Sequence, residues 1–548
     1  MKMKLEKINL KKIDLIVASL LMIIALCIYI SDSWNVMKYD YISMDESYNS
    51  TVAANVIRHG EYKVSYPSDI VFYNVITTGQ TVILPTALAF KIFGINSITS
   101  GLTSFVYSLG VIVLIWVLLN KCFKNSWGGY TNTLTTVLVI LLVLSDSNFQ
   151  YISTRLIGEI AAIFFVLMAL LMLIKYYETH KNYFMGIVGA MIAAAFLTKS
   201  STIFILVSVT GILIIFERNL KLRTLLSYIC GFFSCLVILE IYKFIQLGSL
   251  TNYLDWWQAE WREMMAQSSG VVTTYSIESK YQYLQNIFSG YTPYFCVIII
   301  VLPILLYFVS LSKNYINSNI HAFSIIGVAG SSLEIFFILL GGAGLVYARR
   351  HEINSFIIKV FCFYLLGMLI CYLTKRIIEF GKNKEIANKK YNVTGIIGLF
   401  IIIIYMLINL LPVKTLDKTI KGYVVYKSNE NTLAPKIRAE FLEEIDELPD
   451  DAELYCAGWW QEPNITLFLD RRMHNIYDDY NYEGDTDKQY FIVGNFINNV
   501  KVADIEELIQ GKLTKIDTSE IDYNVYGSAF NREDFELFAI YKITRVSE

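Results

Sequence analysis

Acidic and basic side chains gather in the polar segments that separate long apolar runs of this chain. Asp45 and Glu46 stand side by side in "YISMDESYNS", shortly after the first apolar run. A later segment, "SDSNFQYISTRLIGE", carries Arg155 and Glu159, and the segment "AFLTKSS" carries Lys199. Such residues suit group transfer from a phosphate ester, because a carboxylate can take a proton from a hydroxyl while cations stabilise the departing phosphate.

A further polar segment, "GGAGLVYARRHE", adds Arg349, Arg350 and His351. Arginine presents a planar fork of donors to a phosphate, whereas lysine acts as a point charge. Arg155 and Glu159 are spaced i, i+4, so the sequence predicts that they share one face of a helix. Taken singly, these groups also fit solvated loop pairs, helix-end ion pairs or a snorkelling lysine. Their occurrence together favours a site.

The elements that must position these residues are transmembrane helices. Of the 548 residues, 55% are hydrophobic and 17% are charged, and the mean hydropathy is +0.47. A soluble domain carries about 25% charged residues. Because one bilayer crossing needs about 20 apolar residues, the chain is predicted to cross at 13–31, 100–120, 131–146, 156–175, 183–198, 201–216, 222–243, 292–311, 321–342, 354–374 and 393–413. The shorter run 81–93, with Pro85, is expected to be an interfacial or re-entrant helix.

The distribution of basic residues predicts the orientation of these helices. Short loops such as "KYYETHKN", "ERNLKLR" and "KRIIEFGKNKEIANKK" are rich in Lys and Arg, as cytoplasmic loops are. The N-terminus is therefore expected inside, and all four segments with candidate site residues outside. Arg349 and Arg350 run against this bias, which favours a functional role. With a net charge of −2 and no basic cluster interleaved with aromatic residues, no nucleic acid partner is expected.

The polar C-terminal part is predicted to be a separate extracytoplasmic α/β domain, residues 414–548, that follows a transmembrane domain, residues 1–413. Strand-like runs "ELYCAGWW", "YFIVGNF" and "ELFAIYKI" alternate there with helical patterns such as "PKIRAEFLEEIDEL" and "VADIEELIQ". The expected fold class is thus a polytopic α-helical membrane protein with about eleven or more transmembrane helices and a C-terminal α/β domain.

Aromatic residues mark one long outer loop. The stretch "NYLDWWQAEWREMM", 252–265, predicts an interfacial helix with Trp257 and Trp261 on its membrane face. Trp256 falls on the polar side, where it could stack on a sugar.

The segments that carry the candidate residues resemble those of GT-C class glycosyltransferases, in the protein mannosyltransferase and aminoarabinose transferase branch. "MDESYNSTVAANVIRHGEY" resembles their first outer loop, and "TTGQTVILPTALAFKIFG" resembles the stretch that follows it. "STRLIGEIAAIFFVLMALLML", "AAFLTKSST" and "YARRHEINSFIIKVFCFYLLG" resemble the segments with the second acid, the lysine and the arginine. The resemblance spans most of residues 13–375 in order. In the last segment Arg350-His351 stands where the family has Arg-Tyr, and the usual proline is absent.

The resemblance implies a GT-C fold and an inverting glycosyltransferase in the plasma membrane. Asp45, with Glu46 beside it, would be the base that activates the acceptor, or would only bind if the acceptor were itself a phosphate. Lys199 and an arginine would bind the phosphate of a polyprenyl-phosphate-linked sugar, and Glu159 would position substrate. The resemblance assigns no cofactor with certainty and leaves room for a divalent cation, Mg²⁺ or Mn²⁺, which Asp45 and Glu159 would hold. The implied partners are this donor, membrane lipids and a glycan, lipid or protein acceptor.

A transporter or flippase of lipid-linked glycans is the alternative function, and a membrane-anchored binding protein is a third. A transporter would place ionisable residues near the middle of the membrane on broken helices, whereas here they gather at the outer ends of the predicted helices. It would also need no large outer domain. A binding protein would leave eleven helices unexplained.

Overall fold

The structure is a computed structural model that describes residues 2–39, 44–65, 70–73, 76, 78–123, 130–144, 146–215, 221–269, 433–457, 463–494, 500–516 and 539–545, with isolated residues between 304 and 360. The predicted spans 292–311, 321–342 and 354–374 fall largely outside the described residues, and the span 393–413 falls wholly outside them. The predicted domain boundary at residue 413 also lies outside them.

The N-terminal part is helical. Its elements are α1 (Lys2–Tyr39), α2 (Met44–Arg58), α3 (Gln80–Phe93), α4 (Ser97–Phe123), α5 (Tyr130–Leu144), α6 (Ser147–Thr154), α7 (Glu159–Thr179), α8 (Asn182–Thr198), η1 (Ser200–Thr202), α9 (Ile203–Ile215), α10 (Leu222–Leu247) and α11 (Leu250–Ser269). Each span predicted before residue 250 contains a helix. Among the described residues, α1, α4, α7 and α10 contain segments long and apolar enough to cross a membrane. The membrane character is therefore confirmed, and the count of eleven spans stays a prediction.

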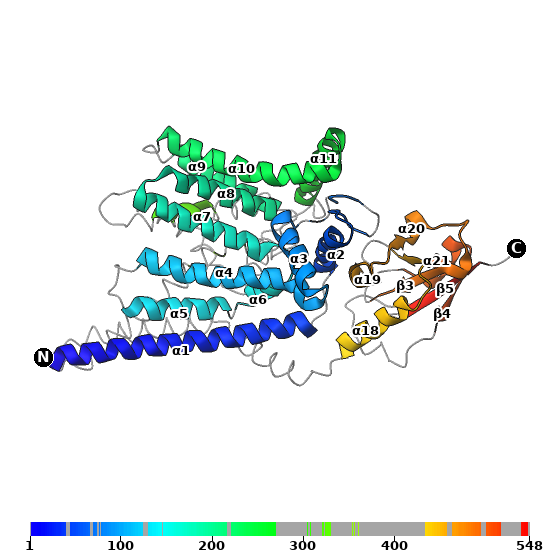
Figure 1. The fold of residues 1–548 in the computed structure, drawn as a ribbon, viewed down its shortest axis with the longest axis horizontal. Coiled ribbons are helices and arrows are strands. Elements are labelled where there is room, and N and C mark those ends of the chain that lie inside the picture. The colour runs from blue at the N-terminus through cyan, green and yellow to red at the C-terminus, as the bar shows by residue number, and fades with distance from the viewer. Residues whose placement is uncertain are drawn as a thin grey trace, which may run out of the picture.

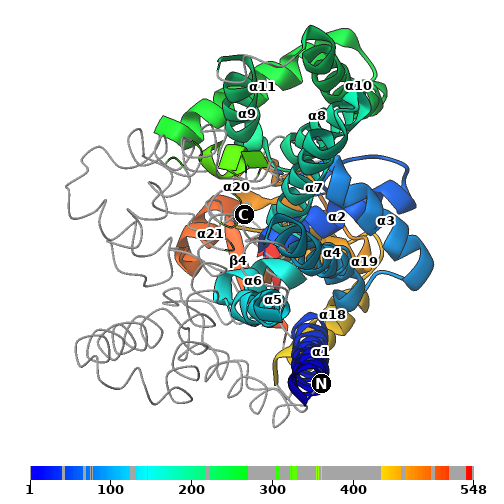
Figure 2. The same cartoon turned by 90° about the vertical axis from the view of Figure 1, so that its left-hand side faces the viewer.

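The long helices run side by side, while α2, α3 and α11 gather at the end of the bundle that faces the C-terminal part (Figures 1 and 2). Helix α8 packs between α7 and α10. Glycines allow its close approach to α10: a Cβ on Gly189 would lie 2.0 Å from the Tyr228 carbonyl oxygen, and one on Gly231 would lie 1.8 Å from the Gly186 carbonyl oxygen. Small residues let the backbones of membrane helices come this close.

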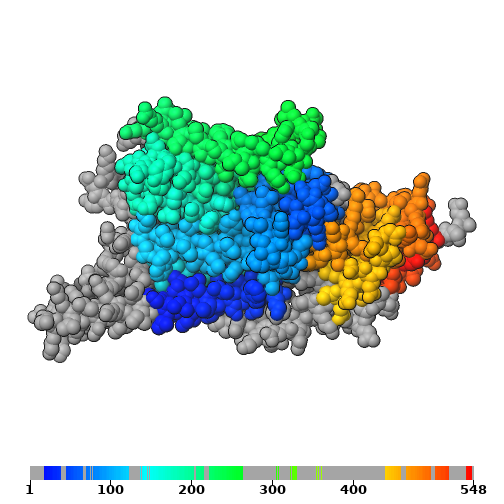
Figure 3. Space-filling model, viewed as in Figure 1, coloured from blue at the N-terminus to red at the C-terminus, as the bar shows by residue number. Residues whose placement is uncertain are grey.

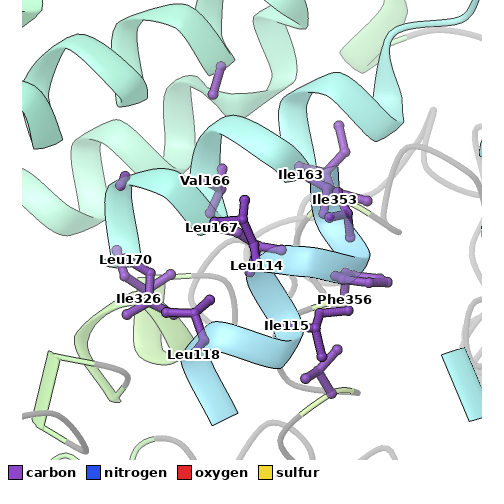
Figure 4. Close-up of a cluster of buried hydrophobic side chains, with 14 of the residues drawn as sticks. Leu114, Ile115, Leu118, Ile163, Val166, Leu167, Leu170, Ile326, Ile353 and Phe356 are labelled. Atoms are coloured by element: carbon purple, nitrogen blue, oxygen red, sulfur yellow. The ribbon is translucent and has the colours of Figure 1, made fainter. Parts of the chain in front are cut away.

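A hydrophobic core joins α4 to α7 (Figure 4). It contains Leu114, Ile115 and Leu118 from α4, Ile163, Val166, Leu167 and Leu170 from α7, and Ile326, Ile353 and Phe356 from further along the chain. All of these side chains are buried. Lipid tails are as apolar as these side chains, so close van der Waals packing, not exclusion of water, stabilises this core.

The C-terminal part is a mixed sheet with helices. Its strands are β1 (Glu453–Cys456), β2 (Met473–Asn475), β3 (Gln489–Val493), β4 (Gly511–Ile516) and β5 (Ala539–Arg545), and its helices are α18 (Leu433–Asp446), α19 (Pro463–Leu469), α20 (Ile476–Asp479), η4 (Thr486–Lys488) and α21 (Val502–Ile509). The strand order is β2-β1-β3-β5-β4. Strands β2, β1 and β3 are parallel, and β5 runs antiparallel to β3 and β4.

The predicted α/β alternation of this part is confirmed for β1, β3, β5, α18 and α21. All five residues of β3 are buried in the middle of the sheet, and the four after Gln489 form a continuous apolar run. Strands β2 and β4 were not predicted. The first has three residues, and the second, "GKLTKI", lies at the sheet edge with no fully buried side chain.

Helix α19 joins the C-terminal part to α2, and Figure 3 shows the two parts in contact. The Ser47 hydroxyl donates to the side-chain oxygen of Asn464 over 2.7 Å, and both residues are buried. Arg58 donates to the carbonyl oxygens of Thr466 and Phe468, each over 3.3 Å. These contacts hold α2, the helix that carries Asp45 and Glu46, against α19.

Candidate functional site

Helix α2 positions the acidic pair. Asp45 and Glu46 lie in its first turn, where the helix dipole favours negative charge. Glu46 is only 4% exposed, and its carboxylate lies 3.6 Å from a guanidinium nitrogen of Arg155. The Leu156 backbone N–H donates to the same carboxylate over 3.4 Å. Asp45 is partly exposed, so of the two acids it is the more accessible to a substrate.

Arg155 and Glu159 do not share a helix face, so that prediction is wrong. Helix α6 ends at Thr154 and α7 begins at Glu159, with a bend between them. Gly158 turns the chain in the left-handed conformation with φ of 88°, which a residue with a Cβ adopts only under strain. The bend directs Arg155 to Glu46 and Glu159 to Lys199.

Glu159 and Lys199 form a buried ion pair. The Lys199 ammonium lies 3.4 Å from a Glu159 carboxylate oxygen, and the two residues are 6% and 0% exposed. Lys199 follows the last residue of α8, and its backbone N–H donates to the Ala195 carbonyl oxygen over 3.0 Å. A buried charge needs such a partner, because an isolated one would be strongly destabilising.

Gly79 lets the chain before α3 approach the end of α8. Its backbone N–H donates to the Thr198 carbonyl oxygen over 3.0 Å. A Cβ at Gly79 would lie 1.5 Å from the Leu197 carbonyl oxygen, so no other residue fits without a backbone shift. The hydroxyls of Thr81 and Thr198 also lie 2.6 Å apart.

Asn49 links α2 to the bend between α6 and α7 and to the segment before α3. Its side-chain amide donates to the Leu156 carbonyl oxygen over 2.5 Å and to the Thr78 hydroxyl over 3.0 Å. The structure thus brings together three of the four polar segments predicted to form a site. Arg349, Arg350 and His351 lie outside the described residues. Asp146 caps α6 by accepting from the backbone N–H groups of Asn148 and Phe149.

Divalent cation binding finds no support in this arrangement. In the described part of the chain, no group of three or more His, Cys, Asp or Glu side chains could hold a metal ion. Glu159, which the resemblance offered as a ligand, faces Lys199, and Glu46 faces Arg155. These carboxylates are already compensated by cations, and we derive no step through a metal.

A pocket beside this site was missed by the sequence analysis. It lies between Thr78–Gln80, Thr198 and the helices α10 and α11. Glu240 and Lys243 form a 2.8 Å ion pair in its wall, and both are buried. The signal was present, because charged residues inside an apolar span are functional candidates by default. Glu240 lies within the predicted span 222–243 and Lys243 is its last residue, so neither was assigned to a polar segment.

Trp256 and Trp257 of α11 line this pocket, whereas Trp261 on the same helix is 60% exposed. Trp257, which was predicted to lie on the membrane face, thus lines the same pocket as Trp256. Tyr253 donates its hydroxyl to Glu240 over 2.8 Å. Burial, with this bond to a carboxylate, raises the pKa of Tyr253, so it remains a donor at neutral pH.

Comparison with known proteins agrees with this fold. Residues 83–242 match the family described as dolichyl-phosphate-mannose-protein mannosyltransferase. This stretch includes Glu159, Lys199 and Glu240. No curated protein sequence matches the chain.

Among solved structures, the chain is similar to ArnT from Cupriavidus metallidurans bound to undecaprenyl phosphate, with a TM-score of 0.51 and 12% identity over 83% of this chain and 85% of that one. It also matches the apo oligosaccharyltransferase of Archaeoglobus fulgidus, with a TM-score of 0.47 and 13% identity over 85% of this chain and 65% of that one. The predicted resemblance to GT-C glycosyltransferases of the mannosyltransferase and aminoarabinose transferase branch is confirmed by the family match over residues 83–242, and the similarity to ArnT shows a shared fold.

Proposed function

We propose that this enzyme transfers a sugar from a polyprenyl-phosphate donor to an acceptor hydroxyl at the outer face of the plasma membrane. The observation that carries the proposal is the convergence of the acidic turn of α2 with the Glu159–Lys199 pair, through Asn49 and Thr78. The ArnT structure, which is bound to undecaprenyl phosphate, supports a lipid phosphate as the donor's carrier. The acceptor is a glycan, a lipid or a protein.

In the proposed reaction, Asp45 accepts the proton of the acceptor hydroxyl as that oxygen attacks the anomeric carbon. The new C–O bond forms on the face opposite the bond to phosphate, which breaks with inversion. The polyprenyl phosphate leaves with the electron pair, and the Lys199 ammonium stabilises its added negative charge. Glu159 holds this lysine in place, and Arg155 holds Glu46 beside the base.

Arg349, Arg350 and His351 remain proposed contacts of the donor phosphate, on the strength of the family resemblance. We further propose that residues 1–413 form the transmembrane catalytic domain and residues 414–548 the extracytoplasmic domain. The N-terminal end of α1 and the C-terminal sheet lie at opposite ends of the bundle (Figure 1). That arrangement supports a cytoplasmic N-terminus and an outer C-terminal domain.

Orientation can be tested with single cysteines at two exposed lysines, Lys181 between α7 and α8 and Lys515 in β4. The background should be a variant whose native cysteines do not react. An impermeant thiol reagent on intact cells should label Lys515→Cys and spare Lys181→Cys, with both labelled after lysis. The reverse pattern would contradict the proposed orientation.

Transfer is tested with purified full-length protein and a panel of undecaprenyl-phosphate sugars, chosen by the sugar missing from the cell envelope of a deletion strain. Asp45→Asn should lower turnover by about 10²–10⁴-fold, the usual contribution of a general base, and should leave donor binding unchanged. Asp255→Asn, on the exposed side of α11, is the matched control. Near-native turnover of Asp45→Asn with a hydroxyl acceptor would remove Asp45 as the base.

A further inference from the structure

The pocket between α10 and α11 has its own set of side chains, separate from the ion pairs above. Its wall contains the aromatic rings of Phe72, Trp256 and Trp257 and the charged groups of Glu240, Lys243 and Glu260. Thr198 and Ser200, on either side of Lys199, line it as well. The pocket is therefore a neighbour of the Glu159–Lys199 pair, and a molecule inside it would lie beside the proposed donor phosphate.

The charges of this pocket are largely compensated internally. Lys243 lies 2.8 Å from Glu240 and 3.6 Å from the centre of the Trp256 ring, and Tyr253 donates to the other Glu240 oxygen. A phosphate on Lys243 would have to displace Glu240 and would face the carboxylate of Glu260 in the same wall. Leaving a buried carboxylate beside an anion is unfavourable, so the pocket selects against a phosphate.

The aromatic rings are held in fixed orientations. The Trp256 indole N–H donates to the Phe72 carbonyl oxygen over 2.5 Å, and the Phe72 ring stacks on Tyr62 with centroids 4.1 Å apart. Trp257 stands nearly perpendicular to Trp256, at 83°. Lys243 lies over both indole rings, 3.6 Å from the centre of Trp256 and 4.8 Å from the centre of Trp257. Trp257 is the less closely covered of the two, so it is the ring better placed to receive a ligand.

These features match a neutral ring that carries hydroxyl groups. A pyranose has C–H surfaces that pack on an indole, and hydroxyls that donate to carboxylates and accept from an ammonium or a tyrosine. A few polar groups in an otherwise aromatic wall are typical of small-molecule sites. A polyol can also bond to Glu240 and Lys243 without separating them.

We infer that the pocket lined by Trp257, Glu240, Lys243 and Glu260 is a subsite for a saccharide ring. The inference rests on the proposed transferase function only for the origin of that ring, which belongs either to the lipid-linked donor or to the acceptor. Binding itself does not depend on catalysis.

The test uses the full-length protein in nanodiscs, titrated with neutral methyl glycosides of mannose, glucose and galactose and, separately, with inorganic phosphate. At least one glycoside should bind saturably, and phosphate should not compete with it. Trp257→Leu should weaken this binding by about tenfold, the effect of losing one aromatic contact. Trp261→Leu, one turn along α11 and exposed, should bind as the native protein does.

Two further variants keep the test decisive if Trp257→Leu fails to fold. Trp257→Phe retains an aromatic surface and should bind with nearly native affinity, whereas Glu260→Gln should weaken binding. Absence of saturable binding by every glycoside, competition by phosphate, or native affinity in both Trp257→Leu and Glu260→Gln would overturn the inference.

The source of the ring is found by repeating the titration with undecaprenyl phosphate and with an undecaprenyl-phosphate sugar that carries the same ring. Loss of glycoside binding only with the sugar-bearing lipid assigns the subsite to the donor. Binding retained with both lipids assigns it to the acceptor. Loss with both would mean that the lipid itself fills the pocket, which contradicts a saccharide subsite.

Asp45→Asn separates this inference from the proposed function. That variant should bind the glycoside normally even though it does not transfer. Saturable glycoside binding by a native protein that transfers no sugar would contradict the proposed function alone. Transfer by a protein whose pocket binds no glycoside would contradict the subsite alone.

Discussion

Two buried lysine–glutamate pairs lie in the helical part, and they are held in different ways. Glu159 and Lys199 come from different helices, 40 residues apart, and meet over 3.4 Å. Glu240 and Lys243 are one turn apart on α10 and meet over 2.8 Å, and Glu240 also accepts from Tyr253. The first pair exists only if α7 and α8 are correctly placed, whereas the second follows from the sequence of one helix.

This difference bears on function. The Glu159–Lys199 pair reports on the placement of α7, α8 and the Gly79 segment, so a change anywhere among them should reach the lysine that we propose binds phosphate. The Glu240–Lys243 pair lies within one helix, so its geometry does not depend on how α11 packs. We therefore expect changes in helix packing to disturb the Glu159–Lys199 pair and to leave the Glu240–Lys243 pair largely intact.

The largest effect is expected when Lys199 is removed. Lys199→Met leaves the Glu159 carboxylate buried without this cation and should destabilise the protein by about 3–5 kcal/mol. The double variant Lys199→Met/Glu159→Gln should recover much of this loss, while transfer stays impaired in both because the donor phosphate loses its cation. Unfolding in detergent and donor binding are the measurements. Equal stability of the single and double variants would show that the pair is not coupled.

Gly79→Ala tests whether the first pair depends on packing. The added Cβ would meet the Leu197 backbone, and overpacking of this kind destabilises by about 1–3 kcal/mol. Because Leu197 is near Lys199, donor affinity should fall as well. Gly211→Ala in α9, where a Cβ would meet nothing within 4 Å, is the control and should be neutral or slightly stabilising. Native donor affinity in Gly79→Ala would separate this junction from the site.

The second pair should respond less. Lys243→Met removes one partner of Glu240, but the Tyr253 hydroxyl remains, so a loss of about 1–3 kcal/mol is expected. Tyr253→Phe should destabilise the Lys243→Met variant more than it destabilises the native protein, because Glu240 then loses both donors. A double-mutant cycle on unfolding measures this coupling. A greater loss in Lys243→Met than in Lys199→Met would reverse the comparison.

The contact between α2 and α19 should contribute less again. Ser47→Ala and Asn464→Ala each remove one neutral hydrogen bond, worth about 0.5–1.5 kcal/mol. If the C-terminal part fixes the position of α2, each variant should also lower turnover. The double variant should then be no less stable and no slower than either single variant. Additive effects in the cycle would show that the two residues act separately.

A carboxylate held by neutral hydrogen-bond donors completes the comparison. Burial raises the pKa of Glu453, but hydrogen bonds from Gln489, Tyr455 and Asn481 outweigh it and hold the pKa below its ordinary value. A lowered folded-state pKa stabilises the protein above the unfolded value of about 4.3 and loses this stabilisation as pH falls through the folded value. Amide protection factors in β1 and β3, which correct for the pH dependence of intrinsic exchange, should therefore fall in acid, and Glu453→Gln should flatten that dependence. An unchanged pH profile would contradict the assignment.

Much of the fold could be predicted because its signals are local. Apolar runs predicted α1, α3, α4, α5 and α7 to α10, and strand-like runs predicted β1, β3 and β5. Strand β4 escaped because an edge strand with no fully buried side chain has no clear pattern, and β2 is too short to show one. Among candidate residues, the segments of Glu46, Arg155 and Lys199 were found from charge type and position alone.

By itself, the sequence determined which residues lie in apolar segments, where charges interrupt them, and which polar turns follow which helices, since hydropathy and charge belong to single residues and short windows. Only the tertiary structure decided the partners. The left-handed Gly158 turn sends Arg155 to Glu46 and Glu159 to Lys199. Likewise, the pocket of Glu240 and Trp257 forms only where α11 folds back beside the Phe72 segment. Such pairings depend on backbone approaches between distant segments, which no local window contains.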